Sequence, residues 1–385
     1  MSKKSVLYIT SRFPYPPLGG DRLKSYNMLR ILSKKYNINF VSIIDRDLTQ
    51  EDIQFCQKHF YKFKIYKKSK FFYLINIIKS IIKFQSLQVN YYYFKDIQKY
   101  INSQVIECDF VLNTLIRTSK YALNINKPKF LDIVDSIYKN YTLSIKNVKS
   151  IFWKLIYIYE KKKIFNYEKK CIKSYDMTYF VNHNEAQFWS KFGHTSWIPN
   201  GVNRDIFTYT KRDDSFKNHI IFFGKMDYQP NIDAVVWFID NVFHKLNNNI
   251  KFTIIGLNPS KKLNKYLNDK ISITGYVKDP YNIINGSFLC IAPMQTGGGI
   301  QNKILETMAL GKITIISSFA ANSLKNAKHN KELLVANTPD EYVSIINDIY
   351  QNYDKYKYIE KNANKFIKDN FTWEIYANKL FSILP

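Results

Sequence analysis

The chain contains few acidic residues for its length. Its 385 residues include 57 Lys and Arg but only 31 Asp and Glu, which gives a formal net charge of +26 at pH 7. Such an excess indicates a polyanionic partner, and nucleic acid, an acidic membrane surface and phosphorylated substrates are all compatible with it. Apolar residues make up 46% of the chain and charged residues 23%, so the composition excludes an intrinsically disordered protein.

Cysteine and histidine are also scarce. The six histidines show no metal-ligand spacing. The four cysteines lie far apart and form no C-x-x-C pair, which is typical of reduced core thiols and argues against a disulfide framework or a zinc site: Cys56, Cys108, Cys171 and Cys290. We therefore expect a cytoplasmic protein without a bound metal.

Long hydrophobic runs are absent. The longest, 71–82, is interrupted by Asn76, Lys79 and Ser80, and it is too short to span a bilayer. Residues 1–4 lead directly into a short strand, so no secretory signal peptide is expected.

Residues 61–85 are the most basic and aromatic part of the chain. Lysines precede a run of Phe, Tyr and Ile, a pattern that resembles an interfacial helix lying on an anionic membrane. A surface helix with one buried face explains the pattern equally well. A second helix is predicted over 151–173, apolar on one face and lysine-rich on the other.

Short apolar runs alternate with helical patterns along the whole chain. The segment 198–203, Ile-Pro-Asn-Gly-Val-Asn, marks a hinge after which a new β–α series begins. The alternation predicts an α/β protein with two Rossmann-like domains facing each other across a cleft. We expect an N-terminal domain over 1–199, a C-terminal domain over 200–368 and a terminal helix over 369–385 that returns to the N-terminal domain.

The most informative stretch runs from the predicted strand 288–292 through Gly297–Gly299 to a helix that ends at Gly311. A glycine loop before a helix presents backbone N–H groups and the positive end of the helix dipole, an arrangement that suits a diphosphate. Lys303 would add a charged donor, and Glu306 would accept hydrogen bonds from sugar hydroxyls. The alternative is an ordinary turn whose glycines only permit tight packing.

Three features of the N-terminal half are also candidates. A proline-rich segment ends at Gly19–Gly20, after which Asp21 is predicted to cap a helix. The run Asp132-Ile-Val-Asp135-Ser136 ends a predicted strand, at the sheet edge where ligands bind in α/β proteins. The Asp45-Arg-Asp47 run could hold a metal–diphosphate, but a solvated acidic turn explains it better.

Seven segments, in this order, resemble the retaining GT-B-fold glycosyltransferases of family 4, including the sugar transferases of exopolysaccharide systems. Each segment alone is weak evidence, whereas seven in the correct order are a specific signal. They are 17–22, 132–136, 198–202, 223–231, 274–279, 297–309 and 371–374.

The resemblance implies a hexosyltransferase that transfers sugar with retention of configuration, without a cofactor or an obligatory metal. The C-terminal domain would bind a nucleotide-sugar, and the N-terminal domain a glycan or lipid-linked acceptor. It further implies a role in capsule, exopolysaccharide or lipopolysaccharide synthesis. The protein would be cytoplasmic or peripheral on the inner face of the plasma membrane, held there through residues 61–85.

The resemblance also implies roles for individual residues. Glu306 would bind the ribose, Lys225 would replace the usual phosphate-binding arginine, and Asp135 would lie near the reacting sugar. The implied catalytic residues are Asp135, Lys225 and Lys303. The implied donor-binding residues are Gly19, Gly20, Gly224, Tyr276, Val277, Gly297, Gly298, Gly299, Ile300 and Glu306.

Two positions depart from the family pattern. Gly298 stands where the family has an acid eight residues before Glu306, and Pro230 stands where it has a second phosphate-binding lysine. We infer that Lys303 supplies the missing charge and that the amides of Gly297–Gly299 hold the donor, because this transfer depends on stabilising the leaving group.

Other functions remain open at this point. A different GT-B enzyme, such as a nucleotide-sugar epimerase, would bind the same donor, and loss of the acid at 298 could mark an inactive scaffold. A non-enzymatic basic protein that binds nucleic acid or membranes would also explain the charge. However, the lysines are scattered and no nucleic-acid-binding motif is present, so we expect no nucleic-acid partner.

Overall fold

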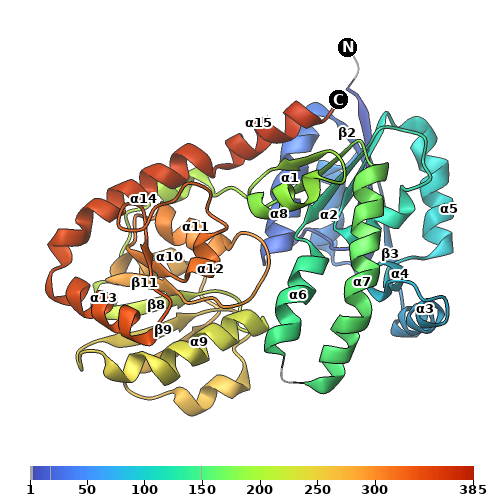
Figure 1. Cartoon of the computed structure of the whole chain (residues 1–385). Helices are drawn as coiled ribbons and strands as arrows, with labels where there is room; N and C mark the ends of the chain where they lie inside the picture. Colours follow the sequence, from blue (N-terminus) through green and yellow to red (C-terminus); the bar gives the residue numbers. More distant parts are fainter. Residues whose placement is uncertain (1–2, 18, 149) are drawn as a thin grey trace. The chain divides into compact units, whose positions relative to one another are not determined.

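The computed structural model of the chain describes residues 3–17, 19–148 and 150–385. It contains two compact units (Figure 1). Unit 1 comprises Met1–Pro199 and Ala377–Pro385, and unit 2 comprises Asn200–Tyr376. Each unit has one parallel sheet with helices packed on it, so the α/β class and the two Rossmann-like sheets predicted from the sequence are confirmed.

The sheet of unit 1 has seven strands in the order β3-β2-β1-β4-β5-β6-β7. All neighbouring strands are parallel. The central strands are almost fully buried, as expected for apolar runs covered on both faces. The strands are β1 (Ser5–Thr10), β2 (Asn37–Ile44), β3 (Lys62–Lys67), β4 (Phe110–Thr114), β5 (Lys129–Val134), β6 (Met177–Phe180) and β7 (Thr195–Trp197).

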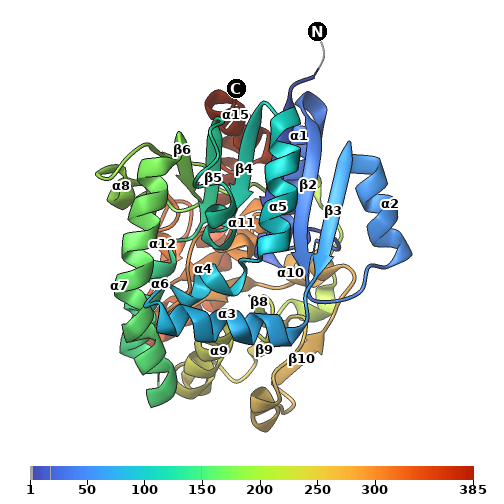
Figure 2. The same cartoon turned by 90° about the vertical axis from the view of Figure 1, so that its right-hand side faces the viewer.

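Helices α1 to α8, formed by the described residues of unit 1, connect these strands. Figure 2 shows α3 lying across one end of the unit, with α4 and α7 beside it. The helices are α1 (Gly20–Lys35), α2 (Gln50–His59), α3 (Lys70–Ile82), α4 (Leu87–Tyr91), α5 (Lys95–Gln104), α6 (Ile137–Asn147), α7 (Ile151–Ser174) and α8 (His183–Ser190).

The sheet of unit 2 has six parallel strands in the order β10-β9-β8-β11-β12-β13. The strands are β8 (His219–Phe223), β9 (Lys251–Ile255), β10 (Ile271–Gly275), β11 (Leu289–Ala292), β12 (Thr314–Ile316) and β13 (Leu334–Val335). The helices are α9 (Gln229–Asn241), α10 (Pro280–Gly286), α11 (Asn302–Ala309), α12 (Ser318–Ala321), α13 (Pro339–Gln351) and α14 (Lys357–Asn370).

The last helix, α15 (Trp373–Ile383), returns the chain to unit 1. Tyr36 donates its hydroxyl proton to the carbonyl of Pro385 over 2.7 Å. The ammonium of Lys379 lies 3.9 Å from the centre of the Trp197 ring. These contacts hold the C-terminal residues against the unit in which the chain begins.

Several element boundaries differ from the predictions. Helix α2 begins at Gln50, where Thr49 and Asp52 form a capping box that was not predicted from the sequence. Asp21 is not the cap of α1. Gly19 is the N-cap with φ +98°, which glycine tolerates, and Asp21 lies in the first turn. Helices α5 and α6 were not predicted.

The four cysteines are buried and form no disulfide. Within residues 3–17, 19–148 and 150–385, no helix has both the length and the apolar character needed to cross a bilayer.

Candidate functional site

In unit 2, the loops that follow β8 and β9 lie against each other at the carboxyl edge of the sheet. Gly224 donates its N–H to the carbonyl of Ile255 over 2.9 Å. A Cβ atom on Gly256 would lie 2.0 Å from the carbonyl oxygen of Gly224. Only glycine therefore fits at Gly256, a residue that the sequence analysis did not single out.

The glycine loop follows β11 at the same edge. Gly297 and Gly299 have φ values of +113° and +68°, which other residues rarely adopt. The side chain of Gln301 donates to the carbonyl of Gly298 over 3.3 Å, and Ile300 is buried beneath the loop. Helix α11 begins at Asn302, and its N-cap residue, Gln301, makes no side-chain capping hydrogen bond.

Lys303 points into the protein. Its Nζ donates to the Oδ1 of Asn231 over 2.5 Å and lies 4.3 Å from the centre of the Phe222 ring. Asn231, at the start of α9, also donates to the carbonyl of Lys225 over 2.8 Å. Burial without a carboxylate partner lowers the pKa of Lys303 to about 7. The site thus contains an ammonium whose nearest acceptor is a neutral amide.

Glu306 lies one turn further along α11. Burial raises the pKa of its carboxyl to about 7, an effect partly offset by a hydrogen bond with Tyr281. Tyr281 and Val277 pack on a small core formed by Ile221, Ile255, Ile284 and Cys290. The packing fixes the position of the Glu306 carboxyl relative to the sheet edge.

Two other predicted residues of unit 2 are exposed. Tyr276 is 67% exposed at the end of β10. Lys225 forms an ion pair with Asp227 over 3.2 Å, and both side chains are nearly half exposed. The structure therefore leaves both side chains accessible to a ligand.

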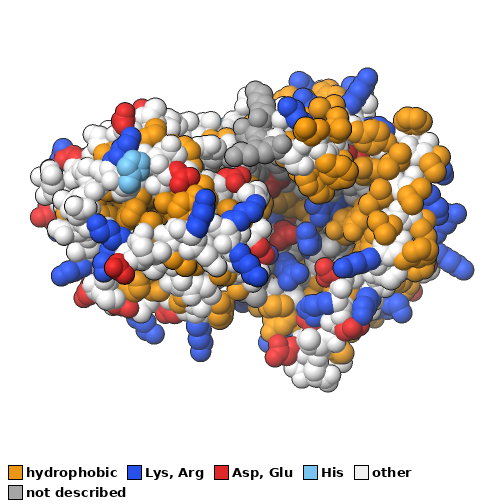
Figure 3. Space-filling model, turned by 90° about the horizontal axis from the view of Figure 1, so that it is seen from below, with side chains coloured by type: hydrophobic (Ala, Val, Ile, Leu, Met, Phe, Trp, Pro, Cys, Tyr) orange, Lys and Arg blue, Asp and Glu red, His pale blue; other side chains and the backbone are white. Residues whose placement is uncertain are grey.

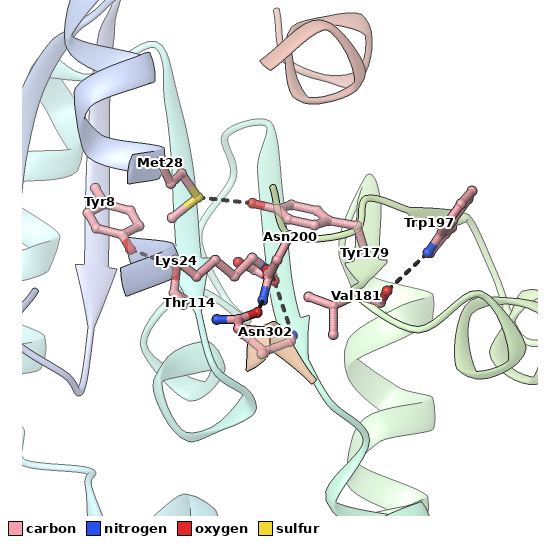
Figure 4. Close-up of polar contacts among 11 residues, drawn as sticks. Tyr8, Lys24, Met28, Thr114, Tyr179, Val181, Trp197, Asn200 and Asn302 are labelled. Atoms are coloured by element: carbon pink, nitrogen blue, oxygen red, sulfur yellow. Dashed lines mark hydrogen bonds and ion pairs between the residues drawn. The ribbon is translucent and has the colours of Figure 1, made fainter. Parts of the chain in front are cut away.

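In unit 1, a buried ion pair lies near the end of β5. Lys24 of α1 donates to Asp132 over 2.6 Å, and the two side chains are 1% and 0% exposed. Figure 4 shows Lys24 beside Thr114, which shares a 2.8 Å hydrogen bond with Tyr8. The Oδ1 of Asp132 also accepts from the N–H of Val134 over 3.1 Å.

The chain then turns sharply at Val134, whose φ of +67° is unusual for a β-branched residue. The pairing of β5 with β6 shifts register at this point. The turn places Asp135 so that its Oδ1 is buried without a hydrogen-bond partner in the described structure. Burial raises the pKa of Asp135 to about 6, and the charge of Lys24 opposes the rise.

Two further carboxylates, from α7 and α8, hold the residue after Asp135. Ser136 donates its N–H to Glu185 over 2.7 Å and its hydroxyl to Glu168 over 2.7 Å. Burial raises the pKa of Glu168 to about 7, and burial together with the charge of Asp135 raises the pKa of Glu185. Neither residue was predicted from the sequence. The available signal was that α7 carries its two acids, Glu160 and Glu168, on one face of a lysine-rich helix.

The remaining candidates of unit 1 are Gly19, Gly20 and Asp47. Gly19 and Gly20 begin α1, and Leu18 before them lies outside the described residues. Asp47 pairs with Lys67 over 2.6 Å on an exposed surface, which agrees with the acidic-turn interpretation. In the described ranges, no group of three His, Cys, Asp or Glu is placed to hold a metal ion.

Solved structures with the GT-B fold match nearly the whole chain. HepE from Anabaena in complex with UDP superposes with a TM-score of 0.70 at 12% identity, covering 98% of each chain. The lipopolysaccharide outer core galactosyltransferase WaaB gives 0.64 at 14% identity, covering 99% of this chain and 100% of that one. At these identities the likeness establishes the GT-B fold.

Sequence comparison adds a family match within unit 2. Residues 217–352 match the family described as "Glycosyl transferases group 1". An uncharacterized glycosyltransferase from Methanocaldococcus jannaschii is 29% identical over 174 residues, which cover 43% of this chain and 44% of that protein. The chain thus aligns with less than half the length of this relative.

Proposed function

We propose that the protein is a glycosyltransferase that moves a sugar from a nucleotide-sugar donor to a glycan or lipid-linked acceptor, with retention of anomeric configuration. The observation that carries this proposal is that the glycine loop, Lys303 and Glu306 lie together at the carboxyl edge of the sheet of unit 2. All three lie inside the segment that matches the group 1 family. The UDP complex of HepE, which shares the fold, supports a nucleotide diphosphate as the donor's leaving group.

In this proposal unit 2 binds the donor. The amides of Gly297–Gly299 and of the first turn of α11 face the diphosphate. Lys303 and Lys225 balance the charge that develops on the leaving group, so the reaction needs no obligatory metal. Glu306 accepts hydrogen bonds from the ribose, and the backbone at Tyr276 and Val277 contacts the base.

Unit 1 binds the acceptor. Asp135 accepts a hydrogen bond from the attacking hydroxyl, and Gly19 and Gly20 let the backbone approach the diphosphate closely. The bond between the sugar C1 and the phosphate oxygen breaks, and a bond between C1 and the acceptor oxygen forms on the same face. The hydroxyl proton passes to the departing diphosphate, so the step needs no separate nucleophile.

We further propose that this reaction serves the synthesis of a cell-surface polysaccharide, such as a capsule, an exopolysaccharide or lipopolysaccharide. WaaB, which is named as a lipopolysaccharide outer core galactosyltransferase, has the same fold, and this likeness supports a role in cell-surface polysaccharide synthesis. A lipid-linked acceptor would place the enzyme in the cytoplasm at the inner face of the plasma membrane. The basic segment 61–85 would provide the contact.

A screen of UDP-, GDP- and ADP-sugars by thermal shift tests the proposal, because a ligand that binds only the folded state raises Tm by mass action. We expect one nucleotide class to raise Tm and its sugar to be transferred to a glycan acceptor. Product anomers assigned by NMR would test retention. A donor that reacts without any acceptor would indicate an epimerase. The absence of any nucleotide effect, together with salt-sensitive RNA or DNA binding, would refute the proposal.

A further inference from the structure

Helix α3 exposes most of its apolar side chains. Only Tyr73 and Ser80 of its 13 residues are buried. Six large apolar side chains of α3 are at least half exposed, and Phe84, just after the helix, is 78% exposed: Phe71, Phe72, Leu74, Ile78, Ile81 and Ile82. A helix with this much exposed apolar surface indicates an interaction site, since soluble proteins rarely leave such patches uncovered.

The first two turns of α7 add a second group of the same kind. Helix α7 is present where the sequence predicted it, but the apolar side chains at its start face solvent. Five of them are at least half exposed: Ile151, Phe152, Trp153, Leu155 and Ile158. No role for these five side chains was predicted from the sequence.

Buried polar contacts fix the segment that follows α3 to α7 within unit 1. Glu160, which is 1% exposed, accepts from the hydroxyl of Ser86 over 2.9 Å and from the N–H of Leu87. The ammonium of Lys163 lies 5.2 Å from the centre of the Phe84 ring. The segment after α3 is therefore fixed to the middle of α7. We call the exposed apolar residues of α3 and of 151–158, with Phe84, the apolar face.

Basic residues surround the apolar face. Residues 61–85 contain seven lysines and no acidic residue. Lys70, Lys79 and Lys83 are exposed on or beside α3, and Lys154 is exposed on α7. Figure 3 shows hydrophobic side chains gathered on unit 1, with Lys and Arg side chains at the edge of the group. This charge pattern complements an anionic surface.

We propose that the apolar face is a two-helix docking site for an anionic lipid bilayer. The apolar side chains of α3 and of the start of α7 enter the headgroup region together, and the surrounding lysines contact anionic headgroups. This assignment deepens the proposed function, on which its meaning rests, because a lipid-linked acceptor is presented by a bilayer. It differs from an anchor through 61–85 alone, because it makes α7 an equal part of the contact.

Tryptophan fluorescence with the full-length protein tests the role of α7. Trp153 is 50% exposed on the apolar face, whereas Trp189 and Trp373 are buried. Vesicles of phosphatidylcholine with phosphatidylglycerol should shift the emission to shorter wavelength, and the Trp153→Phe variant should lose that shift. Vesicles of phosphatidylcholine alone should bind weakly, and added salt should release the protein from the anionic vesicles.

Flotation of variants with the same vesicles separates the two helices. We expect the double variant Phe152→Ser with Leu155→Ser to bind the anionic vesicles more than about tenfold more weakly than the wild type. The double variant Phe71→Ser with Ile78→Ser should show the same loss, because each pair of substitutions removes apolar area that enters the bilayer. Ile106→Ser is the matched control. Ile106 is 73% exposed and precedes the start of β4, whereas α3 follows the end of the parallel strand β3, so its substitution should not change flotation.

Three results would overturn the docking site. They are equal binding to neutral and anionic vesicles, full binding by the α7 variant, or a dimer in solution that the same substitutions dissociate. The last would make the apolar face an interface between two copies of the chain. Thermal shift with UDP, measured without lipid, should be the same in all these variants. If UDP did not raise the Tm of the wild type, that result would count against the proposed function and not against the docking site.

Discussion

A buried lysine lies at the carboxyl edge of the sheet in each unit, and the two lysines have different kinds of partner. Lys24 in unit 1 pairs with the carboxylate of Asp132. Lys303 in unit 2 donates to Asn231, a neutral amide. The charge of Lys24 is therefore neutralised within the protein, whereas the charge of Lys303 is not.

This difference between the partners of the two lysines indicates that the two sheet edges bind ligands of different charge. A diphosphate brings its own negative charge, so a site for it needs an unneutralised cation and backbone N–H groups. An acceptor hydroxyl is neutral, so its site needs carboxylates that the protein provides, such as Asp135.

Lys24→Met should have the largest effect, and the effect should be on stability. The substitution leaves the Asp132 carboxylate buried without its cation, which typically costs about 3–5 kcal/mol. Urea denaturation would measure the change in the free energy of unfolding. The double variant Lys24→Met with Asp132→Asn should recover much of the loss. A single variant as stable as the wild type would contradict the structural role of the pair.

Lys303→Met should leave the fold intact and impair transfer. Removing one donor that stabilises a developing charge typically costs about 10²–10³ in kcat, or roughly 2.7–4 kcal/mol. The Tm without nucleotide should not fall, because no buried carboxylate loses a partner. Initial rates of sugar transfer provide the measurement. Activity within about threefold of the wild type, roughly 0.7 kcal/mol, would show that Lys303 has no such role.

Asp135→Asn should lower the rate of sugar transfer and abolish the decrease in that rate at acid pH. Since the pKa of Asp135 is raised to about 6, its carboxylate is ionised above that pH, and wild-type activity should fall as the pH drops through 6. A raised carboxyl pKa means that ionisation opposes folding, so Asp135→Asn should have a higher Tm than the wild type at pH 7–8. Rates and Tm from pH 5 to 8 would show both effects. Asp47→Asn, on an exposed ion pair, is the control.

Asn231→Asp would give Lys303 the kind of partner that Lys24 has. The new carboxylate should neutralise the ammonium and repel the diphosphate, weakening UDP binding by about tenfold, which corresponds to 1.4 kcal/mol. Calorimetry with UDP gives the measurement, and Gln229→Glu on the same helix is a control outside this contact. Unchanged UDP affinity would place the diphosphate elsewhere.

The smallest effect should be the pH dependence of UDP binding. With a pKa of about 7 in the free protein, Lys303 loses its proton above pH 7, and a bound diphosphate must restore it. UDP affinity should therefore decrease as pH rises from 7 to 9, within the limit of about tenfold per pH unit for one coupled proton. Lys303→Met should bind weakly at every pH and show no such decrease.

The sequence predicted the sheets better than the sites. Buried parallel strands are continuous apolar runs, so the strands expected directly after residues 1–4 and over 288–292 agree closely with β1 and β11. The partners of Lys303 could not be found in this way, because Asn231 lies 72 residues away and only the fold brings the two together. Glu168 and Glu185 are likewise brought to Ser136 by the packing of two helices.

Backbone geometry set a further limit on prediction. Val134 has a β-branched side chain, which favours an extended strand, yet its φ is +67°. Tertiary contacts around Asp132 and Ser136 override the local preference. The Asp-Ile-Val-Asp-Ser run could therefore be placed at a strand end from its residues, but the turn that orients Asp135 could not be predicted.

The return of α15 to unit 1 has a consequence for how the chain can be divided. Unit 2 is one continuous segment, 200–376, inserted between two parts of unit 1. Its entry and exit run side by side, since Val202 pairs with Thr372 and a Cβ on Gly201 would lie 2.4 Å from the Thr372 backbone. A ribosome therefore completes unit 2 before it supplies the last nine residues of unit 1. Unit 2 can therefore be expressed from one continuous gene fragment, 200–376. To express unit 1 alone, residues 377–385 must be joined to Pro199 through a designed linker.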